Sequence, residues 1–344
     1  EAVLGADFEA SYADTEITGS AGLTVPIGID GGDADPISAD FSAELIRALS
    51  AEQNVSATLS YTFENEDPIS AAVDNSISLT PGQTVLNQPS TQTLSGTIGY
   101  QRPIGPVVID ATLGASRTLL GDVTFDDGST VSQSDLNSTS FTAGLRAGLD
   151  TGAVLTPFVE AEASLRRLDE ALDVNGVDRN ARQLALRGGF AWDTGEKFSG
   201  ELGVGYLFED VSDASLDDLA GLSLAAELAW SPRRTLDFGL ALATETRPTG
   251  LQNSAGSIVY SADITAAYQA RANLELSGAL GIEHENGFGE QTDATSVSGQ
   301  VGATYWFNRF AGVTGRVGYD RTFSSDEVRQ SDELSVFMGL RLQR

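Results

Sequence analysis

The sequence lacks cysteine altogether, and its 344 residues include a single histidine, a single lysine and a single methionine. Without cysteine the chain has no disulfide, no thiolate metal site and no cysteine nucleophile. No stretch approaches the roughly 18 consecutive apolar residues that a membrane-spanning helix requires. These absences exclude a disulfide-stapled domain and a helical membrane protein, but they do not select a compartment.

Positive charge is also scarce, because 20 Lys and Arg residues stand against 49 Asp and Glu residues, for a formal net charge of -29. A surface this acidic repels nucleic acids and phosphate polyanions at long range, so we expect no DNA or RNA partner. The chain opens at Glu1 rather than at methionine. That start indicates a mature chain after signal peptide removal, although a trimmed chain would begin in the same way.

What the sequence does contain is a repeated alternation of apolar and polar residues. The stretch NLELSGALGIEHEN, residues 273–286, has leucine or isoleucine at Leu274, Leu276, Leu280 and Ile282, with mostly polar or small residues between them. Successive strand side chains point to opposite faces, so this pattern predicts a strand with one apolar and one polar face. A soluble sandwich strand would show the same alternation, and the choice between water and lipid depends on the rest of the chain.

The alternation recurs in pairs of strand-length runs that are separated by short turn sequences. Seven hairpins are predicted, at 39–50 with 54–63, 93–102 with 106–119, 138–150 with 154–168, 182–193 with 197–211, 219–231 with 233–247, 257–270 with 273–286 and 294–307 with 309–323. One further run stands near each end of the chain, at 4–12 and 334–342. If those two runs pair, residues 1–344 form one all-β domain, a closed antiparallel up-and-down barrel of about 16 strands.

The connections between these hairpins are longer than the turns within them, and they are rich in Asp, Gly, Ser and Asn. This asymmetry is typical of transmembrane barrels of outer membranes, and it predicts short periplasmic turns, longer extracellular loops and two periplasmic termini. The two longest connections are 13–38 and 64–92, and the first contains the apolar stretch GLTVPIGI at 22–29. We expect one or both to fold inside or across the mouth of the barrel and to constrict it.

Aromatic residues on the apolar face favour lipid over water as the surroundings of that face. Two aromatic belts that flank an aliphatic band are expected of a transmembrane barrel. The predicted girdles consist of Trp192, Trp230, Tyr268 and Tyr305 near the tight turns, and of Tyr61, Tyr206, Tyr260 and Tyr319 near the long loops. We therefore expect the outer face to contact outer-membrane lipid and lipopolysaccharide.

The hairpin series, the lack of cysteine and the ending ELSVFMGLRLQR resemble alphaproteobacterial outer-membrane proteins grouped as putative β-barrel porins, with a looser similarity to general diffusion porins. The resemblance covers the whole chain and implies passive transport of small hydrophilic solutes. It also admits a role in export of polysaccharide or other macromolecules. One departure is the ending on Arg344, where many such barrels carry a terminal aromatic residue, although Phe337 lies inside the last predicted strand.

The alternation also sends charged side chains into the lumen, where carboxylates outnumber arginines. The predicted pore-lining residues include Glu160, Glu162, Glu201, Glu227, Asp237, Asp263, Glu275, Glu283, Arg146, Arg187, Arg316 and Arg341. Rings of Asp and Glu favour cations, and a low-dielectric wall focuses their field into the pore. We therefore expect a cation-preferring, non-enzymatic channel for small hydrophilic solutes or ions, with no cofactor.

A barrel hydrolase is the rival from another functional class, since His284 could serve as a catalytic base. No GxSxG elbow or comparable nucleophile signal accompanies this histidine, so we interpret it as a polar residue near the membrane interface. The acidic stretches 30–40 and 122–129 offer oxygen ligands for calcium, but neither has the spacing of a calcium loop. Solvated acidic loops are the simpler interpretation, and we expect no metal site.

A patch of small side chains on the outer face suggests a contact between protomers. The patch consists of Ala111, Ala115, Ala143, Ala147, Ala161 and Ala163 on three predicted strands. Small residues let two backbones approach closely in lipid, so this patch could support a homo-oligomer such as a trimer. The alternative is that alanine is simply common in this chain.

Overall fold

The computed structural model describes residues 2–25, 37–50, 52–65, 87, 89–170, 172–173, 175–195, 197–249, 251, 253–289, 291–325 and 329–342. Its fold is all-β, with 17 strands in one antiparallel sheet, a small two-stranded sheet and one 3₁₀ turn at Ser134–Leu136. The long strands are β1 (Ala2–Ser11), β2 (Thr15–Val25), β3 (Ser38–Ser50), β4 (Gln53–Asn65), β5 (Ser90–Ile104), β6 (Val107–Leu120), β9 (Ser138–Leu149), β10 (Leu155–Leu168), β11 (Ala181–Asp193), β12 (Phe198–Val211), β13 (Leu219–Arg233), β14 (Leu236–Arg247), β15 (Gly256–Arg271), β16 (Leu274–Phe288), β17 (Ala294–Trp306), β18 (Ala311–Ser324) and β19 (Ser331–Leu342). The small sheet pairs β7 (Val123–Thr124) with β8 (Thr130–Val131). None of the helical segments in these ranges is long and apolar enough to cross a membrane.

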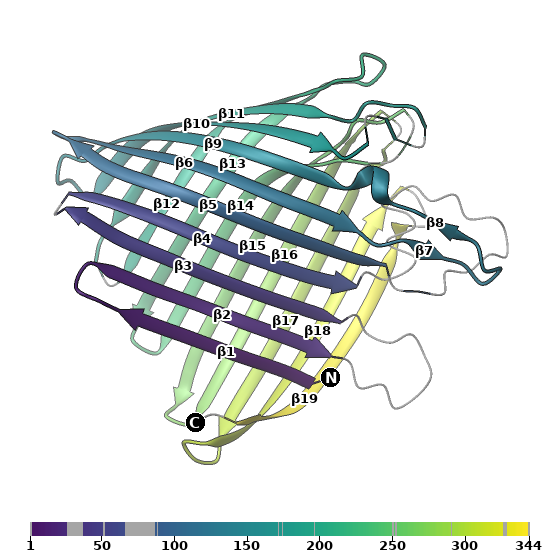
Figure 1. Ribbon diagram of the computed structural model, residues 1–344. Coiled ribbons are helices and arrows are strands. Elements are labelled where there is room, and N and C mark those ends of the chain that lie inside the picture. The colour runs from purple at the N-terminus through teal and green to yellow at the C-terminus, as the bar shows by residue number, and fades with distance from the viewer. Residues whose placement is uncertain are drawn as a thin grey trace.

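Each long strand pairs with the strands before and after it in the chain, so the large sheet is an up-and-down meander. The sheet curls so that β1–β6 form the near wall and β14–β18 the far wall of a barrel (Figure 1). All seven predicted hairpins are confirmed, and the two terminal runs are β1 and β19. Within the described ranges β1 pairs only with β2, and β19 only with β18, so the predicted pairing of the terminal strands is absent there.

The strand β2 corrects the predicted count of 16, because it occupies residues that the sequence assigns to the long connection 13–38. Its outward positions are Thr15, Ile17, Gly19, Ala21, Leu23 and Val25. The small residues Gly19 and Ala21 in the middle make the apolar alternation weak. The ladders with β1 and β3 hold β2 in the sheet, although its own composition does not predict a strand. The ring of Phe8 on β1 lies over Gly19, where an added Cβ would collide with it.

The odd number of strands separates the two ends of the chain. β1 begins at the end of the barrel that carries the long connections, whereas β19 finishes at the end that carries the tight turns (Figure 1). The prediction that both termini lie at the tight-turn end is therefore wrong for the N-terminus. The cause is the extra strand, which reverses the direction of everything that precedes it.

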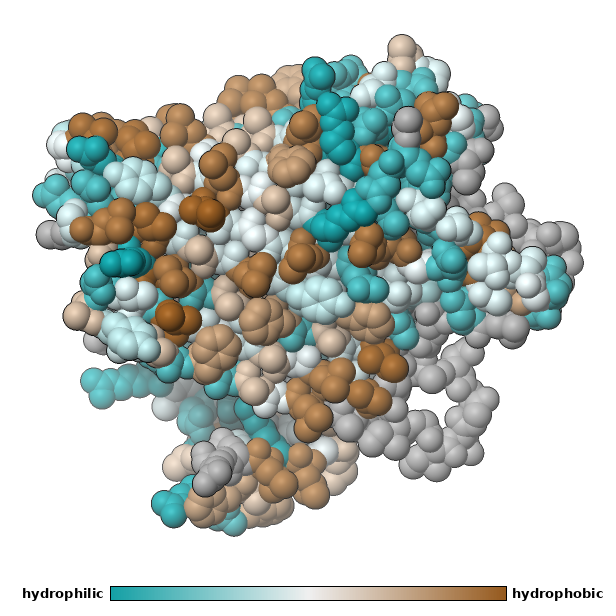
Figure 2. Space-filling model, in the orientation of Figure 1, coloured by the Kyte–Doolittle hydropathy of each residue, from teal (hydrophilic) through white to brown (hydrophobic). Residues whose placement is uncertain are grey.

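The two faces of the sheet differ as the alternation predicts. Apolar side chains in the middle of the strands are open on the outer surface, with Ile98 61%, Leu113 67% and Val301 64% exposed. Figure 2 shows such apolar residues spread across the wall that faces the viewer. Contacts between strands that are not neighbours identify the inner face, because Arg146 on β9 reaches Glu201 on β12 across β10 and β11. Only the concave side of the curled sheet allows such a contact.

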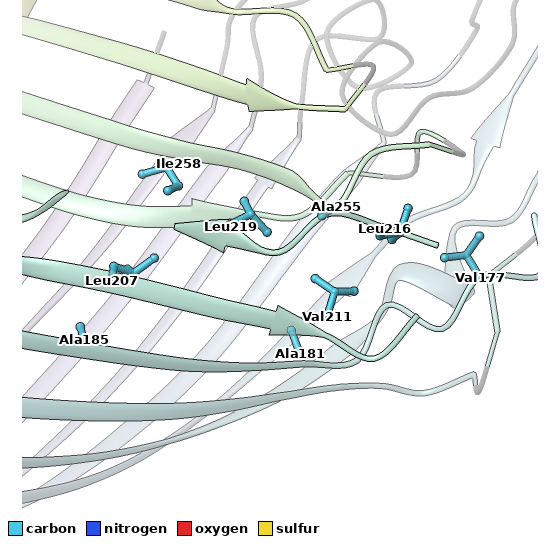
Figure 3. Close-up of a cluster of buried hydrophobic side chains, with 9 residues drawn as sticks. All are labelled: Val177, Ala181, Ala185, Leu207, Val211, Leu216, Leu219, Ala255 and Ile258. Carbon is cyan, nitrogen blue, oxygen red and sulfur yellow. The ribbon is translucent and has the colours of Figure 1, made fainter. Parts of the chain in front are cut away.

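The main buried hydrophobic cluster lies at the long-connection end of the sheet rather than in the middle of the barrel. It joins residues of β11, β12, β13 and β15 to residues of the intervening connections, as Figure 3 shows: Val177, Ala181, Ala185, Leu207, Val211, Leu216, Leu219, Ala255 and Ile258. The ladder between β13 and β14 extends from the tight-turn end only as far as Ala226 and Leu242. Beyond it, Thr246 of β14 accepts a hydrogen bond from Gln183 of β11. The ends of β14 and β15 thus lean across the inner face of β11–β13.

This arrangement changes the expected source of a constriction. The sequence predicts that 13–38 or 64–92 narrows the barrel, but residues 15–25 belong to the wall and 26–36 and 66–86 lie outside the described residues. The described side chains that fill the mouth come instead from β11–β15 and their connections. Deletion of 70–88, which would test the second predicted loop, also falls almost entirely outside the described residues, so that expectation stays a prediction.

Substitution of neighbouring residues in the middle of β5 tests which face meets lipid. Ile98 points outward, and Thr97 is paired with Thr58 and Gly114 on the inner face. An arginine on the lipid face near the bilayer midplane costs about 2–4 kcal/mol. We expect Ile98→Arg to lower the free energy of unfolding in lipid by that amount and Thr97→Arg to lower it much less, as measured by denaturant titration. Equal losses for the two variants would contradict the assignment.

Candidate functional site on the inner wall

Part of the inner wall presents uncharged hydroxyl groups. Six serines on consecutive strands are successive Cα partners, and together they cross the wall from β2 to β9: Ser20, Ser42, Ser60, Ser95, Ser116 and Ser140. The hydroxyls of Ser20 and Ser42 lie 2.8 Å apart, and those of Ser60 and Ser95 lie 2.7 Å apart. Each hydroxyl can both donate and accept, so this serine row offers polar solutes hydrogen bonds without a net charge.

The wall next to the serine row carries alternating charges. Arg146 on β9, Glu160 on β10 and Arg187 on β11 are successive Cα partners, so opposite charges meet directly across the strands. Arg187 donates to Glu160 through Nε at 3.0 Å and to Glu162 at 2.7 Å. Arg146 donates both terminal nitrogens to Glu201, at 3.1 and 2.8 Å. These five predicted carboxylate and arginine positions therefore come together in one network.

A further pair extends this network toward the mouth. Arg166 of β10 donates to Glu209 of β12 at 2.7 Å, and Glu209 is only 2% exposed. The guanidinium of Arg146 also lies over the ring of Phe158, 3.7 Å from its centre. A hollow of about 600 Å³ adjoins the network, with Asp110, Arg146, Glu160 and Glu201 in its lining. Most positive charge on this wall is thus already engaged by carboxylates.

A second row of charged residues crosses the opposite wall and is purely acidic. Strand register places five carboxylates along one transverse row from β12 to β19: Glu201, Glu227, Asp263, Asp320 and Glu333. Glu201 is paired with Arg146, whereas Glu227, Asp263 and Asp320 have no ion pair within the described ranges. Glu333 was not among the predicted pore-lining residues, because it directly precedes the predicted terminal run 334–342. The alternation of β19, with Val336 outside, could have identified it.

The remaining predicted pore-lining residues lie on the same inner face but apart from the network. Glu283 accepts from Arg247 at 3.0 Å, and Asp237 accepts from the hydroxyl of Ser231 at 2.5 Å. Glu275 is the Cα partner of Gln269 and Thr304. Arg316 stacks on Phe337, with 4.7 Å from its guanidinium carbon to the ring centre, and Arg341 lies 5.6 Å from the ring centre of Trp306.

A buried arginine ties together the connections that cover the mouth over β11–β15. Arg179 is 3% exposed, and its Nε donates to Asp173 at 2.5 Å. Its two terminal nitrogens donate to the backbone oxygens of Ser254 at 2.7 Å and Leu251 at 2.6 Å. The connection before β11 is thereby fixed to the connection before β15. Together with the hydrophobic cluster, these bonds form a mouth cap.

Two aspartates of the mouth cap have shifted pKa values. Burial alone would raise the pKa of Asp173, but hydrogen bonds from the Val177 amide and the Arg179 side chain hold it below the usual aspartate value. Hydrogen bonds from the hydroxyl and amide of Ser215 likewise lower the pKa of Asp213. Both carboxyls are therefore charged at neutral pH, and Asp173 neutralises the buried Arg179.

Comparison with known protein families identifies the family of this chain. The family model for "Putative beta-barrel porin 2" matches residues 13–344, which is nearly the whole chain and includes every strand from β2 to β19. The chain belongs to this family. A search of curated proteins finds no match. The family supports the β-barrel porin resemblance, whereas an alphaproteobacterial origin stays a prediction.

Solved structures similar to this porin-family chain are larger outer-membrane receptors and transporters. The FrpB iron transporter from Neisseria meningitidis gives a TM-score of 0.49 at 10% identity, over 96% of this chain and 61% of that one. The siderophore receptor PiuA from Acinetobacter baumannii gives 0.40 at 10%, over 96% and 64%. The ferric yersiniabactin receptor FyuA from Yersinia pestis gives 0.39 at 12%, over 94% and 59%. The chain thus spans about three fifths of the length of these proteins.

The predicted aromatic girdle residues of this porin-family chain lie toward the ends of their strands, and some of them stack on neighbouring rings. At the tight-turn end, Trp192 stacks on Phe198 at 5.7 Å and Trp230 on Phe238 at 5.2 Å between ring centres. Tyr268 and Tyr305 at that end are each 42% exposed. Near the long connections the predicted residues are Tyr61, Tyr206, Tyr260 and Tyr319, of which Tyr206 and Tyr319 are 42% and 43% exposed. Tyr260 does not lie on the outer surface with them, because the end of β15 leans inward and packs Tyr260 against the buried cluster, with its hydroxyl close to Gly221 on the inner face of β13.

Among the described residues, those behind the rival functions are not assembled into a site. The Nδ1 atom of His284 lies 2.9 Å from the hydroxyl of Thr295, its Cα partner on β17. Within the described part of the chain, no three His, Cys, Asp or Glu residues are grouped as a metal would require. In the acidic stretch 122–129, Asp127 instead accepts from the amide of Ser129 and shapes a turn. The stretch 30–40 lies largely outside the described residues.

Larger side chains separate the alanines of the predicted small-residue patch. Its six alanines lie on β6, β9 and β10, which are consecutive in the sheet, and Ala143 is the Cα partner of Ala163. Leu145 is the Cα partner of both Ala111 and Ala161, and Phe141 is the Cα partner of Ala115. Both large side chains are more than half exposed, so the alanines do not form one continuous small surface, and the oligomer stays a prediction.

Removal of one charge tests whether Arg179 holds the mouth cap. Breaking a buried ion pair by removing one partner costs about 3–5 kcal/mol. We expect Asp173→Asn to increase amide hydrogen exchange in residues 175–180 and 253–256 at neutral pH, because Arg179 loses its counter-charge. Asp217→Asn, which removes an exposed carboxylate from the same mouth, is the matched control and leaves exchange unchanged. Equal exchange in both variants would show that the pair does not hold the cap.

Acidification tests the same pair without mutation. A carboxyl with a lowered pKa contributes stability above its unfolded pKa, and this contribution is lost as pH falls through the folded value. Because the folded pKa of Asp173 lies below 3.8, we expect the cap to remain in place down to about pH 4 and to loosen below it. When conductance is recorded between pH 7 and pH 3, it should rise in the wild type below about pH 4. Asp173→Asn would lack this pH-dependent rise.

Proposed function

We propose that the protein is a passive, water-filled channel of the outer membrane for small hydrophilic solutes, with a preference for cations. Membership of a β-barrel porin family and an apolar outer face support the membrane location. The serine row supports passage of uncharged polar solutes, since its hydroxyls replace bonds to water without attracting an ion. No feature of the described residues favours polysaccharide export or hydrolysis over diffusion.

The observation that carries the cation preference is the uneven distribution of charge around the inner wall. Arg146, Arg166 and Arg187 are each bonded to carboxylates, so they offer little free positive field to an anion. Glu227 and Asp263 of the acidic row have no such partner within the described ranges, and both are exposed. A wall of low dielectric focuses the field of these carboxylates into the lumen, which favours cations.

The reversal potential across a potassium chloride gradient tests this preference. We expect wild-type protein in a planar bilayer to favour potassium, and Glu227→Gln with Asp263→Asn to move the potential toward zero. The preference should weaken at 1 M salt, where screening shortens the field to about 3 Å. Glu160 and Glu162 are poorer positions for the test, because their removal also strips Arg187 of its partners.

Removal of the same charge elsewhere provides the control. Asp217→Asn with Asp218→Asn neutralises two exposed residues of the connection after β12, outside the acidic row. These changes should leave the reversal potential near the wild-type value. A wild-type potential of zero or of anionic sign would overturn the cation preference, and absence of any single-channel current would overturn the channel itself.

A further inference from the structure

The first and last strands of the sheet leave backbone groups without strand partners. One edge of β1 and one edge of β19 have no ladder within the described ranges. The outward residues of β19 are unusually open, with Val336 74%, Met338 81% and Leu340 80% exposed, as expected where a neighbour is missing on one side. An unpaired backbone amide or carbonyl in hydrocarbon costs several kcal/mol, so a barrel in lipid must satisfy both edges.

Strand direction decides which strand can close the barrel in the usual antiparallel way. β1 and β19 both run from the long-connection end to the tight-turn end, so a pair between them would be parallel (Figure 1). β2 runs opposite to β19, and the sheet without β1 has 16 strands, one fewer than the 17 present. Single-chain bacterial outer-membrane barrels have even strand numbers and antiparallel closure.

Two independent observations agree with closure by β2. The family match begins at residue 13, so it includes β2 and leaves β1 outside. The inner face also continues without a break, because Thr18 and Ser20 of β2 point to the same side as Ser335 and Phe337 of β19. A pair between these strands would keep Leu23 and Val336 on the outer face.

We propose that β1 is a placeholder strand, which covers the edge of β2 until β19 arrives and is then displaced to give a closed barrel of 16 strands. β1 is joined to β2 by a short turn, whereas β19 lies at the other end of the chain. Short loops close at lower entropic cost than long ones, so the β1–β2 hairpin forms first. Displacement of β1 also leaves the start of β2 and the end of β19, the two strands that would close the barrel, both on the tight-turn side.

The contacts of β1 fit a strand that is specific but replaceable. Its ladder with β2 runs over its full length, from Ala2 paired with Val25 to Ser11 paired with Glu16. The ring of Phe8 over Gly19 fixes the register of this ladder. An uncovered strand edge is a site of aggregation, and β1 protects that edge while the rest of the sheet assembles.

A cysteine at position 20 reports which strand lies beside β2, and the absence of native cysteines leaves no competing thiol. Ser20 has Ser42 as its Cα partner on β3 and Asp7 as its Cα partner on β1. Ser20→Cys would be combined in turn with Ser42→Cys, with Asp7→Cys, and with cysteine at Ser335, Phe337 or Gly339 of β19. Disulfides form only when the two Cα atoms lie within about 7 Å, so each cross-link identifies a neighbour.

In full-length protein folded in outer membrane or lipid vesicles, we expect cysteine 20 to link to position 42 and to one of the β19 positions. Oxidant added early in refolding should trap the link between positions 7 and 20, whereas oxidant added to the mature, reduced barrel should not form it. A second pair of cysteines, at position 18 and at the β19 position two residues further toward the C-terminus, should also link, because antiparallel neighbours shift in opposite directions. A link between 7 and 20 that persists in the mature protein, with a parallel link between 7 and β19, would overturn the proposal.

Two variants separate assembly from the finished structure. Phe8→Ala removes the ring over Gly19, and deletion of residues 2–11 removes β1. Both should slow assembly or lower its yield, while the barrels that do assemble keep the wild-type conductance and the link between position 20 and β19. Loss of that link in the assembled Phe8→Ala protein would overturn the placeholder role. The result does not depend on which solute passes through the lumen, so it stands apart from the proposed function.

Discussion

Backbone hydrogen bonding between neighbouring strands is the constraint on which the rest of this structure depends. A spanning segment in hydrocarbon finds no water for its amides and carbonyls, so each strand must lie beside another. The short turns make the chain satisfy this need with its nearest neighbours in sequence, which produces the meander. The same need is unmet at the two edges of the sheet, where β1 and β19 each have a ladder on one side only within the described ranges.

The ladders also convert the alternation of single strands into rows that cross the barrel. A serine on one strand meets a serine on the next because register aligns them, as Ser42 does with Ser20 and Ser60. In the same way Glu227 faces Glu201, although 26 positions separate them in the chain. The lumen therefore has a hydroxyl wall, a neutralised Arg and Glu network and an acidic wall. This division, rather than the total charge, decides where an ion would be attracted.

Wall and mouth are held by different forces. The wall exposes its apolar side chains to the outside and buries few of them, so its order comes from the ladders. The mouth cap is a small hydrophobic core inside the curl of β11–β15, fastened by the buried Arg179. Loss of the cap would leave the wall intact, because none of the ladders passes through Arg179. The cap can therefore respond to pH separately from the barrel.

The sequence by itself determined the strands and their faces, because a period of two follows from strand geometry alone and separates Leu59 from Ser60 without a partner. It failed at β2, where the small residues Gly19 and Ala21 weaken the apolar face and only neighbouring strands reveal the ladder. It also could not find the bond from Arg146 to Glu201 or the bonds of Arg179 to Ser254. Those contacts depend on register and on curvature of the sheet, which bring distant residues together and which no local pattern records.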